Sequence, residues 1–302
     1  MEKSKSITIN APAKVNLYLK ITGKRSDGYH TLETVMQKIN LYDTVELTLT
    51  EHQGISLTCP DSSLPEDQSN LAYRAAEKFY SVLIARGVSV YGVGITLQKG
   101  IPIAAGLGGG SSDAAAVLSG LNALYGSPLG VREMAEVGVS LGADVPFFLQ
   151  SGSICIATGI GEILKPVCSD ASYWFVVVNP GFSVSTKWVY ENFVLTEDEK
   201  KINLDRSRIK KWWRSCGQGS SCPFPMDCLY NDLEQVTAAR YGQIKQIKHS
   251  LIQCGAAHAL MSGSGPTVFG VFASEHQAAH CVQRIKGSES FVSLAQVVGG
   301  QG

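Results

Sequence analysis

The residues from Ile101 to Ala116, IPIAAGLGGGSSDAAA, place the tightest constraint on what this chain can fold into. Glycine accepts positive φ and lets other groups approach the backbone, so these glycines can direct several N–H groups into one small volume. Apolar residues recur at helical spacing from Ala114 to Tyr125, and Gly126 follows as a C-terminal cap. A glycine-rich loop that opens a helix favours an anion such as phosphate, because free N–H groups and the positive end of the helix dipole point at it.

The loop does not follow the two commonest phosphate-binding patterns. The chain has no GxxxxGK[ST], and the glycines of the loop are not spaced as GxGxxG. A loop of small residues that serves only close packing is the alternative. The sequence therefore predicts a phosphate site of another type.

Composition narrows the class of protein. A chain of 302 residues is longer than most single domains, so we expect two lobes with a cleft between them. The formal net charge is zero and no dense basic run occurs, which argues against nucleic acid as a partner. The apolar runs are far shorter than the roughly 18 residues that cross a bilayer, so we expect no membrane contact and a cytoplasmic location.

The cysteines and the segment around them predict no metal or disulfide site. The eight cysteines are scattered and form no CxxC pair, so reduced thiols are expected. Cys216, Cys222 and Cys228 are evenly spaced but have no histidine nearby, which favours loop residues over a zinc site. The stretch from Glu197 to Ser221 is charged and then rich in serine and glycine, so we expect a mobile surface excursion.

The N-terminal part of the chain is predicted to be rich in sheet. Residues 6–19 alternate as a strand pair broken by Pro12. Alternation puts Lys14 and Asn16 on one face, where a cation and an amide can line a cleft; a solvated strand face is the alternative. A polar turn ends in His30, and a lone histidine is more often an ordinary surface or core residue than a functional one.

Three further polar residues stand out from their surroundings. Asn70 precedes the apolar stripe of a helix, with a simple helix cap as the alternative to a functional role. Lys99 lies just before the glycine loop, within reach of its ligand, with a solvated turn residue as the alternative. Asp144 lies between small and strongly apolar residues, where a carboxylate is costly to bury unless it is paired or has a task. That cost makes Asp144 a candidate base.

The second lobe is expected to open with a buried strand from Tyr173 to Val178. Ser185 and Thr186 can cap a segment that runs to Phe193. A helix is expected to begin at Asn231 and to continue through the 240s. Strand, small-residue turn and strand follow over residues 255–272, and a last helix and strand end the lobe.

Three motifs occur in order along the chain: PAKVNLYL at Pro12–Leu19, the glycine loop, and MSGSGPTVF at Met261–Phe269. In this order they resemble the superfamily of galactokinase, homoserine kinase, mevalonate kinase and phosphomevalonate kinase, over nearly the whole chain. Within it, DGYHTLETVMQ, the expanded loop GLGGGSSDAAA, GADVPFF and NDLE resemble the branch that acts on 4-diphosphocytidyl-2-C-methyl-D-erythritol.

The resemblance implies an α+β fold of two lobes with the active cleft between them. Residues 1–168 would form an N-terminal ATP-binding and catalytic domain with a ribosomal-protein-S5-like fold, and residues 169–302 an α+β C-terminal domain. The implied enzyme is a monomer or weak homodimer that uses ATP and Mg²⁺ to phosphorylate the 2-hydroxyl of the cytidine diphosphate methylerythritol, in the non-mevalonate isoprenoid pathway. The rivals are a kinase for another small alcohol, against which DGYH argues, and a non-catalytic sugar-phosphate sensor, against which intact Lys14 and Asp144 argue.

The same resemblance implies roles for individual residues. Asp144 would be the catalytic base, assisted by Lys14. The resemblance marks no second carboxylate as a metal ligand, so Mg²⁺ would be held mainly by ATP. The segment Trp213–Pro223 matches no motif of the family. The substrate-binding residues would be Asn16, Tyr29, His30, Thr186 and Tyr190, and the ATP-binding residues Asn70, Lys99, Pro102, Gly106, Leu107, Gly108, Gly109, Gly110, Ser111 and Ser112.

Overall fold

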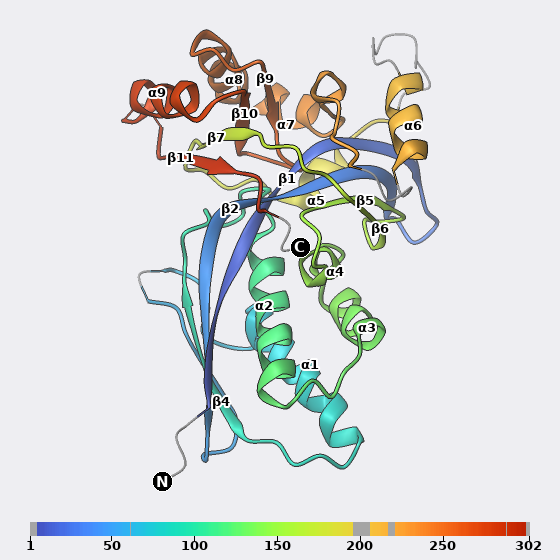
Figure 1. The fold of residues 1–302 in the computed structure, drawn as a ribbon, viewed down its shortest axis with the longest axis vertical. Coiled ribbons are helices and arrows are strands. Elements are labelled where there is room, and N and C mark those ends of the chain that lie inside the picture. The colour runs from blue at the N-terminus through green and yellow to red at the C-terminus, as the bar shows by residue number, and fades with distance from the viewer. Residues whose placement is uncertain (1–4, 61, 196–205, 217–220, 288, 300–302) are drawn as a thin grey trace. The chain divides into compact units, whose positions relative to one another are not determined.

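The computed structural model describes residues 5–60, 62–195, 206–216, 221–287 and 289–299. These residues form two compact units that alternate along the chain, and Figure 1 traces their elements. The first unit contains the described residues up to Ala13, together with Leu41–Ile101 and Gly108–Gln150. The second unit contains Lys14–Asn40, Pro102–Leu107 and the described residues from Ser151 onward. Helices and strands mix in both units, as the α+β prediction requires.

Two long strands, β1 (Ser6–Lys24) and β2 (His30–Thr50), have residues in both units. The predicted break at Pro12 is wrong, because β1 continues through this residue. Within the described chain, β8 (Tyr230–Asn231) is the second neighbour of β1 and pairs with it at Tyr18 and Leu19. At Pro12 the strand is therefore an edge on that side, where a missing N–H breaks no ladder.

The first unit packs helices on a sheet. Strand β4 (Gly92–Gln98) pairs antiparallel with the second half of β2 and parallel with β3 (Ile55–Thr58). Helix α2 (Gly109–Leu124) is followed by Gly126 at φ 77°, which confirms the helix predicted before this glycine, and α3 (Val131–Leu141) ends before Gly142. Alternate strand residues and one stripe of each helix share the core: Val45, Leu47, Val93, Ile95 and Leu97 with Phe79, Leu83, Val117 and Leu121. The helices α1 (Leu71–Ala85) and α4 (Val145–Leu149) complete the unit.

The second unit contains an antiparallel sheet in the order β11-β7-β10-β9, formed by β7 (Trp174–Asn179), β9 (His258–Met261), β10 (Val268–Phe272) and β11 (Phe291–Gln296). Its core joins Val176 and Val178 to α8 (Gln243–Gln253) and α9 (Glu275–Ile285). The helix predicted to run from Asn231 through the 240s is divided, because α7 (Glu234–Arg240) ends before α8 begins.

A second group of elements in this unit surrounds the first part of β2. Strand β5 (Ile154–Thr158) pairs with β2 and with β6 (Ile163–Val167). Helix α5 (Thr186–Glu191) packs through Val189 on a cluster that contains Leu19, Ile21 and Leu32. A 3₁₀ turn spans Met226–Cys228.

The segment expected to be a mobile excursion is partly ordered. Residues 206–215 form helix α6 (Arg206–Ser215), while 196–205 and 217–220 lie outside the described residues. Ile209, Trp212 and Cys216 are buried at the spacing of one helical face, and the Trp212 ring meets Phe224 edge to face. The prediction failed here because it rested on the charge of the segment, whereas Lys210 and Lys211 are exposed and lie off the buried face of an amphipathic helix. The described helices also include none that is long and apolar enough to cross a membrane.

Candidate active site

The two halves of the glycine loop are anchored by different contacts. In the second unit, Gly106 has φ 78°, and a Cβ there would lie 2.2 Å from the Ser262 carbonyl oxygen, so only glycine fits without a shift. The Gly106 carbonyl accepts a hydrogen bond from Ser262 Oγ at 2.9 Å, and the Leu107 carbonyl accepts one from Lys14 N at 2.9 Å. All three sequence motifs therefore meet at this end of the loop.

In the first unit, the loop continues directly into α2. Its N-cap residue, Gly108, lies in the left-handed region at φ 73°, and no side chain caps the helix. The first-turn N–H groups are thus left for a ligand. Ser112 Oγ is buried and has no hydrogen-bond partner among the described residues. This arrangement has the free donors that a bound phosphate needs.

Lys14 and Asn16 form a buried polar pair rather than a solvated strand face. Lys14 Nζ donates to Asn16 Oδ1 at 2.5 Å, and both residues are at most 5% exposed. Asn16 Nδ2 donates to Thr34 Oγ1 at 2.9 Å, and Asn16 N donates to Ser262 Oγ at 3.3 Å. The predicted pairing of a cation and an amide is confirmed; the catalytic role of Lys14 stays a prediction.

His30 lies in an aromatic setting. Its ring is 5.5 Å from that of Tyr190, tilted by 30°, and 6.3 Å from Phe193, edge to face. Burial and then the charge of Lys24 lower the pKa of His30 below its usual value, which favours the neutral imidazole at neutral pH. Tyr29 is 61% exposed, so its side chain takes no part in this group.

Thr186 begins α5 next to the small-residue turn between β9 and β10. Its Oγ1 shares a hydrogen bond of 2.8 Å with Ser264 Oγ, and the Ser264 carbonyl accepts one from Thr237 Oγ1 at 3.1 Å. Ser185 Oγ caps the helix by accepting from Trp188 N at 3.3 Å, as the sequence predicts. Pro102 opens the second unit's share of the loop.

Asn70 is the N-cap of α1. Its Oδ1 accepts from Ala72 N at 3.0 Å, and its Nδ2 donates to the Pro65 carbonyl at 2.9 Å. These bonds confirm that Asn70 caps the helix, which was one of the two roles that the sequence allowed. The ATP-binding role of Asn70 stays a prediction. Asp144 is half-buried at the start of α4, directly before the fully buried Val145.

Lys99 is not a solvated turn residue. Its Nζ forms ion pairs with Asp43 Oδ2 and, at 2.6 Å, with Asp113 Oδ2, and its side chain is 9% exposed. Burial and the negative charge of Asp43 raise the pKa of Asp113 to about 7, although Lys99 opposes the shift. Neither partner was predicted from the sequence, although Asp43 begins the alternating strand DTVELTLT and Asp113 ends the motif GGGSSD.

Three further neighbours of the candidate residues were not predicted from the sequence: Thr34, Phe193 and Ser262. Thr34 shares the strand parity of His30, so alternation alone could have found it. Ser262 lies in the MSGSGP motif, but its contact with Asn16 joins residues that are 246 positions apart. No local pattern reveals such a pairing.

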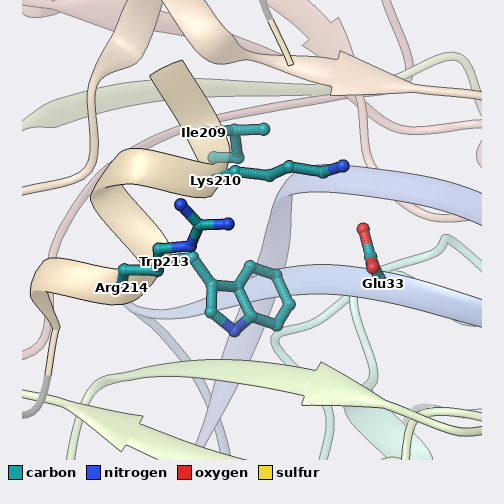
Figure 2. Close-up of a pocket in the computed structure, with 5 residues that line it drawn as sticks. All are labelled: Glu33, Ile209, Lys210, Trp213 and Arg214. Atoms are coloured by element: carbon teal, nitrogen blue, oxygen red, sulfur yellow. The ribbon is translucent and has the colours of Figure 1, made fainter. Parts of the chain in front are cut away.

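A hollow beside α6 lies away from these residues. Figure 2 shows it lined by Glu33 of β2 and by Ile209, Lys210, Trp213 and Arg214 of α6. Glu33 alternates with Leu32 and Thr34, so it faces the other side of the strand. Leu32 packs with α5 and Thr34 bonds Asn16, so the hollow is on the face of β2 opposite to those residues.

Comparisons with known proteins place the chain in a class. One family model, GHMP kinases N terminal domain, matches residues 70–152, and another, GHMP kinases C terminal, matches residues 225–288. A crystal structure of homoserine kinase from Cytophaga hutchinsonii shares the fold, with a TM-score of 0.73 at 18% identity over 100% of this chain and 97% of that one. The fold and the glycine loop together define a GHMP kinase.

Closer relatives identify the family within that class. A curated 4-diphosphocytidyl-2-C-methyl-D-erythritol kinase from Geobacter metallireducens is 44% identical over 291 residues, 96% of this chain and 98% of the relative. One from Desulfotalea psychrophila is 46% identical over 87% of this chain and 85% of its own length. A crystal structure of 4-(cytidine 5'-diphospho)-2C-methyl-D-erythritol kinase has a TM-score of 0.77 at 32% identity and covers 97% of this chain and 100% of its own. The chain belongs to the 4-diphosphocytidyl-2-C-methyl-D-erythritol kinase family.

Proposed function

We propose that this protein transfers the γ-phosphoryl group of ATP to the 2-hydroxyl of 4-diphosphocytidyl-2-C-methyl-D-erythritol, a step of the non-mevalonate isoprenoid pathway. The observation that carries the proposal is the buried ammonium of Lys14, held by Asn16 and joined through Ser262 to the Gly106 end of the glycine loop. A fixed cation beside a phosphate loop is what phosphoryl transfer needs, because positioning and charge stabilisation dominate its catalysis. The names of the near full-length relatives support the choice of substrate.

In the proposed reaction the hydroxyl oxygen forms a bond to the γ-phosphorus as the bond to the β–γ bridging oxygen breaks, and ADP leaves. The Asp144 carboxylate accepts the hydroxyl proton as general base. The Lys14 ammonium stabilises the negative charge that develops on the transferring group. Asn16 Oδ1 keeps the ammonium from moving, because it accepts one of its protons.

The triphosphate is proposed to bind along residues 106–112. The uncapped start of α2 and the unpartnered hydroxyl of Ser112 fit a phosphate ligand. Across the described residues, no group of three or more His, Cys, Asp or Glu side chains is placed to hold a metal ion. We therefore propose that Mg²⁺ is held mainly by the ATP phosphates; when bound, it neutralises part of their charge.

The cytosine is proposed to lie against the ring of Tyr190, with the neutral imidazole of His30 and the backbone of Tyr29 at its hydrogen-bonding edge. The close approach of the His30 and Tyr190 rings supports this placement. Thr186 lies one turn before Tyr190 on the same short helix and is proposed to contact the substrate as well.

A coupled assay of ADP release tests the proposal. Wild-type protein should turn over the cytidylated methylerythritol and release little ADP with mevalonate, homoserine or galactose. Asp144→Asn, which keeps the size of the side chain but cannot take the proton, should lower turnover by about 10²–10⁴-fold with unchanged thermal unfolding. Equal turnover of the other alcohols would contradict the proposed substrate. A lack of ADP release with the cytidylated methylerythritol as well as with the other alcohols would favour a non-catalytic sensor.

A further inference from the structure

Three charged side chains form a buried cluster at the base of the glycine loop in the first unit. Asp43 comes from β2, Lys99 follows β4, and Asp113 lies in the first turns of α2. Lys99 Nζ contacts Asp43 Oδ2 and Asp113 Oδ2, and the three side chains are 0%, 9% and 3% exposed for Asp43, Lys99 and Asp113. Burial of this kind costs free energy unless each charge is compensated.

Asp43 also holds the backbone that enters the loop. Its Oδ1 accepts hydrogen bonds from Gly100 N at 2.7 Å and from Ile101 N at 2.8 Å. Its Oδ2 would lie 3.3 Å from a Cβ at Gly109, so this carboxylate reaches the first residue of α2. One side chain thus contacts both the entrance of the loop and the helix start that the proposed function gives to the phosphates.

With both carboxyl groups ionised, the cluster carries one net negative charge. It contains two carboxyl groups and one ammonium, and Asp113 Oδ1 is buried with no partner among the described residues. A negative charge next to the N-terminus of α2 would repel a phosphate at that position. Lys99 is the ammonium that compensates both carboxyl groups, and two of its three N–H donors are engaged with them.

We propose that Lys99 is a positioning residue for ATP rather than a ligand of ATP: its positive charge offsets the charges of Asp43 and Asp113 beside the first turn of α2, so that this turn stays favourable to phosphate. The inference rests on the proposed function, because it takes the triphosphate to bind at α2. It replaces the direct contact with ATP that the family resemblance implies for Lys99.

A neutral replacement of the whole cluster distinguishes a positioning role of Lys99 from a direct contact of Lys99 with ATP. Lys99→Met leaves two buried acidic groups uncompensated, and it should raise the KM for ATP at least tenfold while the KM for the cytidylated substrate changes less than twofold. The triple variant Asp43→Asn, Lys99→Met, Asp113→Asn has no ammonium and no carboxylate. It should bind ATP within about threefold of wild type, measured by calorimetry without the acceptor substrate. Lys78→Met, at an exposed lysine of α1, is the matched control and should bind ATP as wild type does.

Each other outcome decides against the inference. A triple variant that folds, by its thermal transition, but binds ATP at least tenfold more weakly than wild type shows that the ammonium itself contacts ATP. A wild-type KM for ATP in Lys99→Met shows that the cluster has no effect on the site. The triple variant decides alone if Lys99→Met fails to fold. Because ATP binding is measured without acceptor, failure of wild type to phosphorylate the cytidylated substrate contradicts only the proposed reaction, whereas a wild type that binds no ATP overturns both.

Discussion

At the scale of single residues, the environment of His30 decides which form of its side chain meets a ligand. Its pKa is lowered by burial and by Lys24, so the ring carries one N–H donor and one acceptor nitrogen at neutral pH. A charged imidazolium would offer two donors. A neutral ring can accept as well as donate, so it can help to distinguish cytosine from uracil, whose pairing edges have opposite donors and acceptors.

The first prediction follows from this pattern. Wild-type protein should use the cytidine substrate at least about tenfold better in kcat/KM than its uridine analogue, since a mismatched buried polar group costs roughly 1–3 kcal/mol. His30→Ala should lower kcat/KM for cytidine and narrow its advantage. Tyr190→Ala is the matched control, because stacking tolerates any base, and it should reduce the use of both substrates alike. Equal use of both substrates by wild type would remove His30 from base recognition.

At the scale of elements, periodicity predicts most helices because their cores are regular. The helix over Ala114–Tyr125 is predicted because apolar residues recur at helical spacing and Gly126 follows its end. Helix α6 was not predicted, because the charge of its segment belongs to the exposed side of an amphipathic helix. Strand β2 runs unbroken through Tyr42, so the apolar alternation on either side of this residue belongs to one strand. Local sequence thus predicts a regular buried helix face well and the length of a strand poorly.

Strand β2 also buries a lysine, which has the strand parity of His30 and Leu32. Lys38 is 6% exposed, and its backbone bonds Ser153 on one side and Val298 on the other. Burial lowers the pKa of Lys38 from 10.5 to about 8, with an opposing effect from Cys155. The folded state therefore binds fewer protons than the unfolded state between pH 8 and 10.5. By linkage, the stability of wild type rises with pH across that window.

The second prediction uses Lys38→Met, which keeps most of the volume but has no charge. Relative to this variant, wild type should gain about 3 kcal/mol of unfolding free energy as the pH rises from 8 to 10.5, and nothing further below or above that window. Denaturant titrations at fixed pH values measure the difference. Lys78→Met, whose lysine is exposed on α1, should show no such slope. A constant difference between wild type and Lys38→Met would show that the lysine is as easily charged in the fold as in the unfolded chain.

At the scale of the whole molecule, the residues proposed to hold the cytosine belong to one compact unit, whereas the glycine loop is divided between the two units. His30 and Tyr190 are 160 positions apart by their numbers, yet both belong to the second unit, where Leu32 and Val189 share a core. The family motifs mark these residues as candidates. Composition does not show where the chain passes from one unit to the other, and two of these points, after Ala13 and after Asn40, fall within strands. The domain border expected after residue 168 stays a prediction.

This arrangement gives the last prediction, in which each ligand protects its own peptides against hydrogen exchange. Cytidine 5'-diphosphate should slow exchange in α5 and in the segment that begins β2 at His30, although these peptides are distant in sequence. A non-hydrolysable ATP analogue should slow exchange at the first turn of α2, where the phosphates would accept hydrogen bonds from N–H groups that no side chain caps. At a ligand concentration of about 100 Kd the stabilisation is about 2.7 kcal/mol, so protection by up to about a hundredfold is expected. Helix α9 carries no candidate residue and serves as the internal control. Protection of α5 by the ATP analogue alone, or of α2 by cytidine diphosphate alone, would contradict the assignment of the two ligands to these residues.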